Sequence, residues 1–372
     1  MKTICIAGLK GGIGKTNTAI ALAYVAANEY GKKVLLIDND SQSSTSIMLG
    51  VTPNNYDKRT PFSNIAEALD KLETEDLSYE RNFLDGEPPE DDPEYEDELD
   101  VNGIHTVLAE MIQRGKDIDG IPRLDKALID ECIYTPTFKL FQVRKDENGK
   151  VIRGEDGKTI KEHVEYEFGF DLMPSTEYLS DVQFFWDADH MGKTNFRLRG
   201  IQLKMVVDFI DKNYDYDYCI IDNPPSLDLL AANGMAAAKA GIIIPVSQDK
   251  QSLFSLKRIV RAVWPIKWAN KGHAGILGVL LTIFNEKRTV DRYIAKTVGH
   301  DLRLHVFETR IPETNDAKKA ILAGLILPQI NERNYKENVK LFKEIEEQIA
   351  VCEEHEKAKN NDLGNGSQNE KK

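Results

Sequence analysis

The chain of 372 residues lacks the usual marks of metal clusters, disulfide frameworks and membrane spans. Its four cysteines, Cys5, Cys132, Cys219 and Cys352, lie far apart and form no C-x-x-C pair, so we expect reduced thiols. The apolar stretch at the N-terminus is soon broken by glycines and is too short for a signal peptide. No run approaches the ~18 apolar residues of a membrane span. These absences predict a soluble protein of the cytoplasm.

Positive charge is also in short supply. The chain carries 48 Lys and Arg against 61 Asp and Glu, a net charge of −13, which at first argues against nucleic acid because phosphates attract basic residues. The acidity is uneven, however, since residues 85–100 (DGEPPEDDPEYEDELD) contribute −10 and leave −3 for the rest. We expect a disordered acidic insertion near residues 56–104, because such a segment cannot bury enough apolar surface to fold. Two interpretations stay open: an acidic linker, and a docking or DNA-mimicking segment.

Hydrophobic residues make up 41% of the chain, which is enough for a sizeable core. Short β-branched and aliphatic runs alternate with helical patterns, which predicts βαβ crossovers. The expected fold class is α/β, with a mostly parallel sheet covered by helices on both faces. The expected strands are residues 3–7, 33–37, 218–221, 241–246 and 276–284, and helical patterns span residues 16–28 and 199–212.

Turn signals and polar composition set the expected domain organisation. Asn148 with Gly149, and Asp156 with Gly157, predict a hairpin-like insertion near residues 143–164. The end of the chain is polar. We therefore expect a single domain over residues 1–352, interrupted by the two insertions, and a polar flexible tail over residues 353–372.

A glycine-rich loop, residues 10–16 (KGGIGKT), lies between the first expected strand and the first expected helix. Its glycines allow a tight turn whose N–H groups point at an anion, and the helix N-terminus adds partial positive charge. Lys15 is expected to reach the β- and γ-phosphates of a nucleotide, and the Thr16 hydroxyl to bind Mg²⁺. This predicts a P-loop NTPase type of fold. The expected nucleotide-binding residues are Lys10, Gly11, Gly12, Ile13, Gly14, Lys15, Thr16 and Asn17.

Carboxylates follow two of the expected strands. Asp38 and Asp40 come after the run KVLLI, and Asp222 comes after residues 218–221. In open α/β sheets the ligand binds at the carboxyl ends of the strands, where such acids can hold Mg²⁺ or its bound water. Helix capping by Asp40 and a plain turn at Asp222 are the alternatives. Together with the loop, the acids indicate a nucleoside triphosphatase whose metal ligands are Thr16, Asp38 and Asp222.

The chain resembles the ParA/MinD family of deviant Walker-A ATPases, and its ParA-type partition branch in particular. The resemblance covers most of the chain outside the two insertions. The matching segments are LKGGIGKTNTAIALA, KVLLIDNDSQSSTS, YDYCIIDNPPSLDLLAANGMAAA, LLTIFNEKRT and TRIPETNDAKKAILAGLILP.

The resemblance implies a mechanism for these residues. Two ATP-bound subunits form a homodimer, in which Lys10 crosses into the partner's site and stabilises charge on the phosphates. Asp40 matches the acid that orients water, and Asp38 matches its neighbour near Mg²⁺. The catalytic residues would be Lys10, Lys15 and Asp40, with ATP and Mg²⁺ as cofactors and slow hydrolysis stimulated by a ParB-like centromere-binding or other protein.

Two positions depart from the family pattern. Asn17 stands where threonine is usual, which weakens the expected α-phosphate contact without removing it. Ser41 replaces the usual proline, which is expected to loosen the loop that carries Asp40 and to affect the hydrolysis rate more than binding.

The resemblance also implies DNA binding without sequence preference, through basic residues. Residues 257–303 carry ten Lys and Arg and three Asp and Glu, a local charge of +7, so the bulk acidity does not exclude DNA. The candidate contacts are Arg258, Arg261, Arg288 and Arg292. A solvated helix face is the alternative interpretation. We expect a nucleoid-associated protein that drives plasmid or chromosome partition.

Other classes fit less well. A MinD-like regulator would end in a basic amphipathic helix, whereas the last apolar helix, residues 339–349, carries three glutamates, so we expect no membrane binding. An iron–sulfur electron carrier would need paired cysteines, and a capsule-type kinase a tyrosine-rich tail. A MinD-like or cargo-positioning ATPase that acts through protein partners without DNA stays open as the alternative function, and a nonenzymatic scaffold only if hydrolysis is absent.

Overall fold

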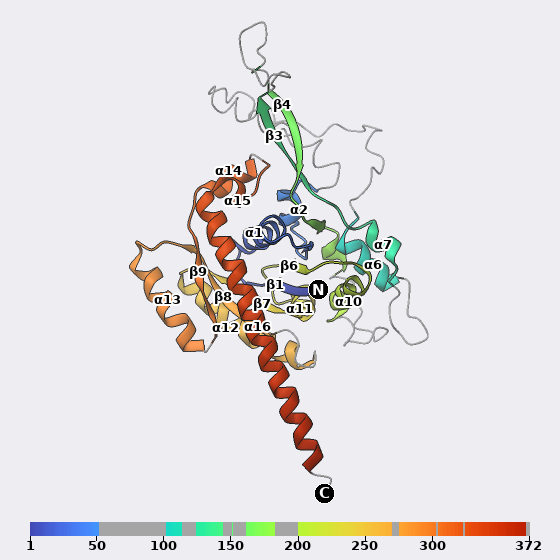
Figure 1. Cartoon of the computed structure of the whole chain (residues 1–372), viewed down its shortest axis with the longest axis vertical. Coiled ribbons are helices and arrows are strands. Elements are labelled where there is room, and N and C mark those ends of the chain that lie inside the picture. The colour runs from blue at the N-terminus through green and yellow to red at the C-terminus, as the bar shows by residue number, and fades with distance from the viewer. Residues whose placement is uncertain are drawn as a thin grey trace.

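The protein contains a seven-stranded parallel sheet in the order β5-β2-β6-β1-β7-β8-β9 (Figure 1). The computed structural model describes residues 1–51, 102–113, 124–143, 151, 161–182, 200–269, 275–302, 304–322 and 324–369. The strands are β1 Lys2–Ile6, β2 Val34–Asp38, β5 Asp171–Met173, β6 Tyr218–Asp222, β7 Gly241–Val246, β8 Ile276–Phe284 and β9 Val306–Pro312. This architecture confirms the α/β class expected from the alternating pattern.

Helices cover both faces of the sheet. On one face, the core contains side chains from α6 Ile104–Gln113, α7 Lys126–Asp130, α10 Gln202–Asn213, α11 Leu229–Ala237, α12 Lys250–Ala269 and α13 Thr289–Leu302. On the other, it contains side chains from α1 Lys15–Asn28 and α16 Glu332–Asn369. The shorter helices are α2 Ser44–Met48, α14 Asp316–Leu322 and α15 Leu327–Ile330. Across the described ranges, no helix is both long enough and apolar enough to span a membrane.

The central strands are buried along their whole length, which explains their continuous apolar sequences. Every residue of β2, β6 and β7 is buried. Successive side chains point to opposite faces, so Leu36 and Ile220 join the core beneath α1, while Leu35 and Ile221 join the core beneath α10 and α11. The strand β5 of only three residues and the partly exposed β9 were not among the strands expected from the sequence.

A separate two-stranded antiparallel sheet extends from the body of the protein (Figure 1). Its strands β3 Thr137–Val143 and β4 Lys161–Glu167 pair along their whole length and flank the range in which the turn signals predict a hairpin-like insertion. Residues 144–150 and 152–160 of that range, and residues 52–101 with the acidic segment, lie outside the described residues. The helix α16 covers most of the expected tail, and the division into one domain, two insertions and a tail stays a prediction.

Aromatic packing attaches α16 to the sheet. The Phe342 ring is 1% exposed, and its centroid lies 4.8 Å from that of Tyr30 and 5.2 Å from that of Tyr218. The Tyr218 hydroxyl donates a hydrogen bond of 2.9 Å to Glu346 on the same helix. Phe342 therefore joins α16 to β6 and to the turn that follows α1.

Replacing Phe342 by alanine should lower the free energy of unfolding by about 3–5 kcal/mol, because the change removes a buried ring and leaves a cavity. Urea denaturation followed by circular dichroism measures this loss. Val351→Ala on the same helix is the control, since Val351 is 44% exposed and its truncation should change stability by less than about 0.5 kcal/mol. Equal losses in the two variants would contradict the proposed anchoring.

Candidate nucleotide-binding site

The glycine-rich loop joins β1 to α1 and is shaped to hold an anion. Gly12 and Gly14 have positive φ angles of 73° and 83°, a conformation that glycine adopts without strain. A Cβ atom at Gly11 or Gly12 would meet no other atom within 4 Å, so the loop borders open space. The Thr282 hydroxyl of β8 donates a 2.7 Å hydrogen bond to the Ile13 carbonyl and fixes the loop against the sheet. This backbone, followed directly by the N-terminus of α1, fits the phosphates of a nucleotide.

Lys15, the first residue of α1, lies beside the loop. Its side chain is buried, and its Nζ donates to the Lys10 carbonyl at 3.5 Å. Burial lowers the pKa of Lys15, whereas Asp222 and Asp40 favour its charged form. A desolvated ammonium group next to an anion cradle is suited to bind phosphate oxygens. Asn17 is half-buried in the first turn of α1.

The parallel pairing of β2 with β6 sets Asp38 opposite Asp222 at the carboxyl edge of the sheet. Both side chains are buried, at 0% and 1% exposure. Asp38 Oδ2 accepts hydrogen bonds from the Ser46 N–H at 2.9 Å and from the Ser46 hydroxyl at 2.7 Å. Asp222 Oδ2 accepts from the Thr16 hydroxyl at 2.7 Å and from the Thr45 hydroxyl at 2.8 Å. Four donors from three residues therefore stabilise two carboxylates that lie side by side.

Burial dominates the electrostatics of this pair. It raises the pKa of Asp38 to about 7, and the neighbouring Asp222 carboxylate adds to the rise. It raises the pKa of Asp222 to about 6, although the hydrogen bonds from Thr16 and Thr45 oppose the rise. Two desolvated carboxylates of like charge are stabilised when a cation binds beside them.

The donor set fits Mg²⁺ bound together with a nucleotide. Asp222 Oδ1 is buried and has no hydrogen-bond partner among the described residues, and the Thr16 hydroxyl lies next to the same carboxylate. Hard oxygen ligands of this kind suit Mg²⁺, which also keeps waters and phosphate oxygens in its shell. Within the part of the chain that the structure describes, no group of three or more His, Cys, Asp and Glu residues could hold a metal ion. The nucleotide would thus complete the shell.

Asp40 lies in a hydrogen-bonded turn after β2. Its N–H donates to Asp38 Oδ1 at 3.3 Å, its side chain accepts from the Gln42 N–H at 3.0 Å, and its carbonyl accepts from the Ser43 N–H at 2.8 Å. The turn holds Asp40 half-buried at the same edge of the sheet as Asp38 and Asp222. The hydrogen bonds within residues 38–43 therefore define the conformation of this turn, which contains Ser41 where the family pattern has proline.

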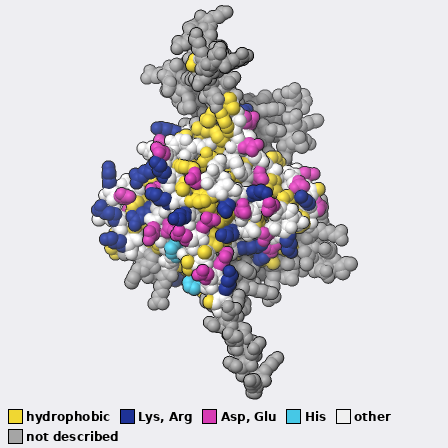
Figure 2. All heavy atoms as spheres, in the orientation of Figure 1, with side chains coloured by type: hydrophobic (Ala, Val, Ile, Leu, Met, Phe, Trp, Pro, Cys, Tyr) yellow, Lys and Arg dark blue, Asp and Glu magenta, His cyan; other side chains and the backbone are white. Residues whose placement is uncertain are grey.

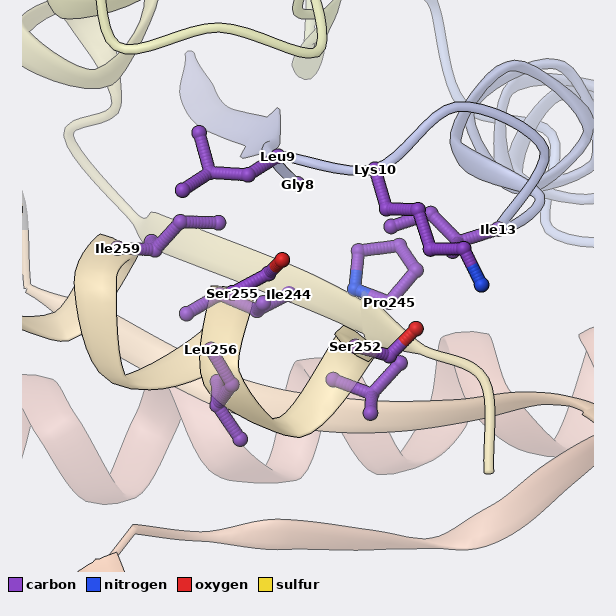
Figure 3. Close-up of a pocket in the computed structure, with 11 residues that line it drawn as sticks. Gly8, Leu9, Lys10, Ile13, Ile244, Pro245, Ser252, Ser255, Leu256 and Ile259 are labelled. Atoms are coloured by element: carbon purple, nitrogen blue, oxygen red, sulfur yellow. The ribbon is translucent and has the colours of Figure 1, made fainter. Parts of the chain in front are cut away.

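Lys10 is paired within its own chain. Its Nζ forms a 2.7 Å ion pair with Asp249, the residue just before α12, and both side chains are about a third exposed. Figure 3 shows Lys10 extending over Pro245 toward the end of α12 that carries Ser252, beside a small pocket between the loop and this helix. Partial burial alone would raise the pKa of Asp249, but hydrogen bonds from Lys10, Ser247 and Ser252 lower it below its ordinary value.

Sequence reasoning missed Thr45, Ser46 and Asp249. The first two belong to the hydroxyl-rich run SQSSTS directly after Asp40, which is the only sequence signal for them. Asp249 follows the end of β7, so the rule that ligands bind at the carboxyl ends of parallel strands could have pointed to it. All three residues lie outside the glycine-rich motif, so its pattern could not reveal them.

The four arginines expected to contact DNA occupy two neighbouring segments. Arg258 and Arg261 are exposed on α12, a helix that contains five basic residues and no acidic one. Arg288 and Arg292 lie at the start of α13. Arg288 pairs with Glu313 at 2.8 Å, and Arg292 donates to the Glu286 carbonyl at 3.3 Å.

Basic side chains also gather around α13. In Figure 2 they lie at the left of the molecule, where Figure 1 places this helix. Among the other basic residues of the stretch 257–303, Lys257, Lys267, Lys287 and Lys296 are exposed, whereas Lys271 and Arg303 lie outside the described residues.

Comparison with known proteins identifies relatives of this chain and structures with a similar fold. A chromosome partitioning protein ParA of Caulobacter vibrioides is 23% identical over 312 residues, which cover 84% of this chain and 80% of that protein. The complex of Cyanothece McdA with ATP has a similar fold, with a TM-score of 0.59 at 19% identity, covering 93% of this chain and 96% of McdA. A Borrelia burgdorferi B31 protein assigned to plasmid partition and bound to AMPPNP gives a TM-score of 0.53 at 21% identity, covering 94% and 99%.

The sequence also matches the CbiA family, described as the CobQ/CobB/MinD/ParA nucleotide binding domain, over residues 4–327. The match includes the glycine-rich loop, both buried carboxylates and the sheet that brings them together. The chain therefore belongs to the CobQ/CobB/MinD/ParA family of P-loop nucleotide-binding proteins.

Proposed function

We propose that this protein is a ParA-like ATPase that dimerises on ATP, binds DNA without sequence preference and hydrolyses ATP slowly to drive plasmid or chromosome partition. The observation that carries the proposal is the meeting of Lys10, Lys15, Asp38, Asp40 and Asp222 at one edge of the sheet. Relatives named for partition support it, as does the fold shared with nucleotide-bound structures.

The residues of the loop would hold the triphosphate. The N–H groups of residues 10–16 surround the phosphates, and Lys15 neutralises charge on the β- and γ-phosphates. Thr16, Asp38 and Asp222 would hold Mg²⁺, which neutralises phosphate charge when bound. Asp40, the more accessible of the acids in this cluster, would orient the attacking water and accept its proton.

Dimerisation would bring Lys10 into the partner's site, where it stabilises charge developing on the transferred phosphoryl group. In the single chain this lysine is held by Asp249, so the ion pair must open before Lys10 can reach across. The Lys10–Asp249 ion pair would therefore be closed in a single subunit and open in the assembled dimer. Slow turnover and stimulation by a ParB-like or other partner are consistent with such a requirement.

The proposed DNA surface is the exposed face of α12 together with the start of α13. Phosphate contacts from arginine and lysine suffice for binding without sequence preference. Arg258 and Arg261 are the better candidates, because Arg288 already pairs with Glu313. The proposed location, cytoplasmic and on the nucleoid, follows from this surface.

Replacing Asp40 by alanine should leave the dissociation constant for ATP within about threefold of wild type and lower kcat by about a hundredfold or more, the range for loss of a proton acceptor. Nucleotide binding by calorimetry and phosphate release by a coupled assay separate the two effects. Asp215→Ala is the control, because Asp215 is 93% exposed and forms its 2.6 Å ion pair with Lys33. Unchanged turnover in Asp40→Ala would refute the assignment of Asp40.

Replacing Asp249 by asparagine should lower the dissociation constant of the ATP-bound dimer by up to about thirtyfold, since a partly exposed ion pair contributes at most about 1 kcal/mol and one pair opens in each of the two subunits. Asparagine keeps an oxygen for the Ser252 N–H that caps α12. Its NH2 group takes the place of the oxygen that accepts from the Ser247 and Ser252 hydroxyls, and these hydroxyls can turn to accept from it, so the main loss is the charge that pairs with Lys10. Sedimentation velocity with ATP measures the dimer. The gain should vanish in the Lys10→Ala background, and dimerisation that weakens or does not change would contradict the inferred restraint.

Replacing Arg258 and Arg261 together by alanine should weaken binding to random-sequence duplex DNA in the presence of ATP. The slope of log affinity against log salt should fall by about 2, because each neutralised phosphate contributes about −0.9. Fluorescence anisotropy at several salt concentrations, with ATP, with ADP and with Lys10→Ala, tests both the surface and its dependence on the dimer. Lys343→Ala on α16 is the control for removal of an exposed positive charge.

The wild-type protein decides between the two candidate functions in the same assay. If it shows no ATP-dependent, salt-sensitive binding, DNA partition is excluded, and a cargo-positioning ATPase acting through protein partners takes its place.

A further inference from the structure

Two asparagines directly follow the two buried carboxylates. Asn39 and Asn223 are the first residues beyond the ends of β2 and β6. Because Asp38 and Asp222 lie opposite each other, the two asparagines that follow them are also neighbours. Their side chains are 0% and 1% exposed. A primary amide is unfavourable in such a place unless its polar atoms are hydrogen-bonded. Three of the four amide atoms have partners, whereas Asn39 Oδ1 has none among the described residues.

The two amides bind to each other. Asn39 Nδ2 donates to Asn223 Oδ1 at 2.8 Å, and both groups are buried. The backbone repeats the connection, because the Asn39 N–H donates to the Asp222 carbonyl at 2.9 Å. The two strand ends are therefore joined by a main-chain hydrogen bond and, beyond it, by a side-chain bridge.

The bridge is also anchored to the first turns of α11. Asn39 Nδ2 donates to the Leu230 carbonyl at 3.1 Å, and Asn223 Nδ2 donates to the Ala231 carbonyl at 3.0 Å. Gly234 allows this approach, since a Cβ there would lie 2.0 Å from Asn223 Oδ1 and 3.0 Å from Asn39 Nδ2. A side chain at position 234 would therefore collide with the amide bridge.

This geometry restrains the acid that follows. Asp40 directly follows Asn39 in the chain. The Asp40 N–H donates a hydrogen bond to the Asp38 carboxylate, which also accepts one from the Ser46 N–H. The short loop is thus fixed on both sides, by Ser46 beneath Asp38 and by the amide bridge at Asn39. Neither amide is accessible to a nucleotide, so any effect on chemistry must act through the neighbouring acids.

We propose that Asn39 and Asn223 are positioning residues, whose amide bridge holds the strand ends that carry Asp38, Asp40 and Asp222 in one fixed relation for ATP hydrolysis. The inference rests on the proposed function for the reaction, but its structural half, the restraint of the loop, does not. An amide that only fills the core would affect stability alone, whereas a positioning amide affects kcat at unchanged nucleotide affinity.

The test uses Asn39→Ala, Asn223→Ala and the double variant of the full chain, with Asn39→Ser as a milder replacement in case alanine prevents folding. Asn338→Ala is the matched control, because Asn338 is also a buried amide, at 1% exposure, but lies on α16 beneath the opposite face of the sheet. The measurements are kcat, the dissociation constant for ATP, and backbone hydrogen exchange of a peptide covering residues 38–46.

Each bridge variant should lower kcat by about ten- to a hundredfold, the effect of a small misplacement of reacting groups, with the ATP dissociation constant within about threefold of wild type. Exchange of residues 38–46 should quicken, and the double variant should lose less than the sum of the two singles, because the bond between the amides is shared although each amide also has its own bond to α11. Asn338→Ala should change neither exchange in that peptide nor kcat.

Either of two results in the single variants would overturn the inference: a loss of kcat no greater than in Asn338→Ala, or unchanged exchange over residues 38–46. If wild type itself neither binds nor hydrolyses ATP, the proposed function fails, and the exchange measurement alone decides whether the bridge restrains the loop. Additive losses in the double variant would likewise contradict a shared bridge.

Discussion

The burial of two like-charged carboxylates next to each other constrains the whole nucleotide site. Asp38 and Asp222 are brought together by the parallel pairing of β2 and β6, and neither is open to water. Thr16, Thr45 and Ser46 direct their hydroxyl groups at these acids, which explains why the short helix α2 lies against the sheet at this point. The energetic cost that remains would favour binding of a cation together with the proposed nucleotide.

The loop that binds phosphate is also connected to α12. Lys10 extends from the loop to Asp249 at the N-terminus of that helix, and Asp249 in turn accepts hydrogen bonds from two serines. In the proposed dimer the lysine changes partner, so the same helix would carry the acid that holds Lys10 at rest and the arginines offered to DNA. This shared helix is a physical route by which nucleotide state and DNA binding could be coupled, since both would depend on one rigid element.

Much of the site could be predicted from the sequence because the relevant patterns are local. The spacing of glycines in residues 10–16, and acids placed directly after apolar strands, indicate a phosphate loop and its metal edge without any knowledge of distant contacts. The partners of Thr45 and Asp249 could not be identified from local patterns. Thr45 meets Asp222 across 177 residues and Asp249 meets Lys10 across 239 residues, and only the order of strands brings those segments together. Ser46 lies only eight residues from Asp38, but no local spacing marks it as the partner of that acid.

The sequence by itself determined the α/β class, the candidate phosphate loop and the placement of acids at the ends of strands. Each of these features depends on periodicity or on residues adjacent in the chain. Only the tertiary structure decided which partner each acid and lysine has. Lys10 pairs with Asp249, Arg288 pairs with Glu313, and Asn39 meets Asn223 because strand pairing and helix packing place them within hydrogen-bond distance. Charge counts along the chain cannot show this, since a salt bridge or an amide bridge is a property of separation in space.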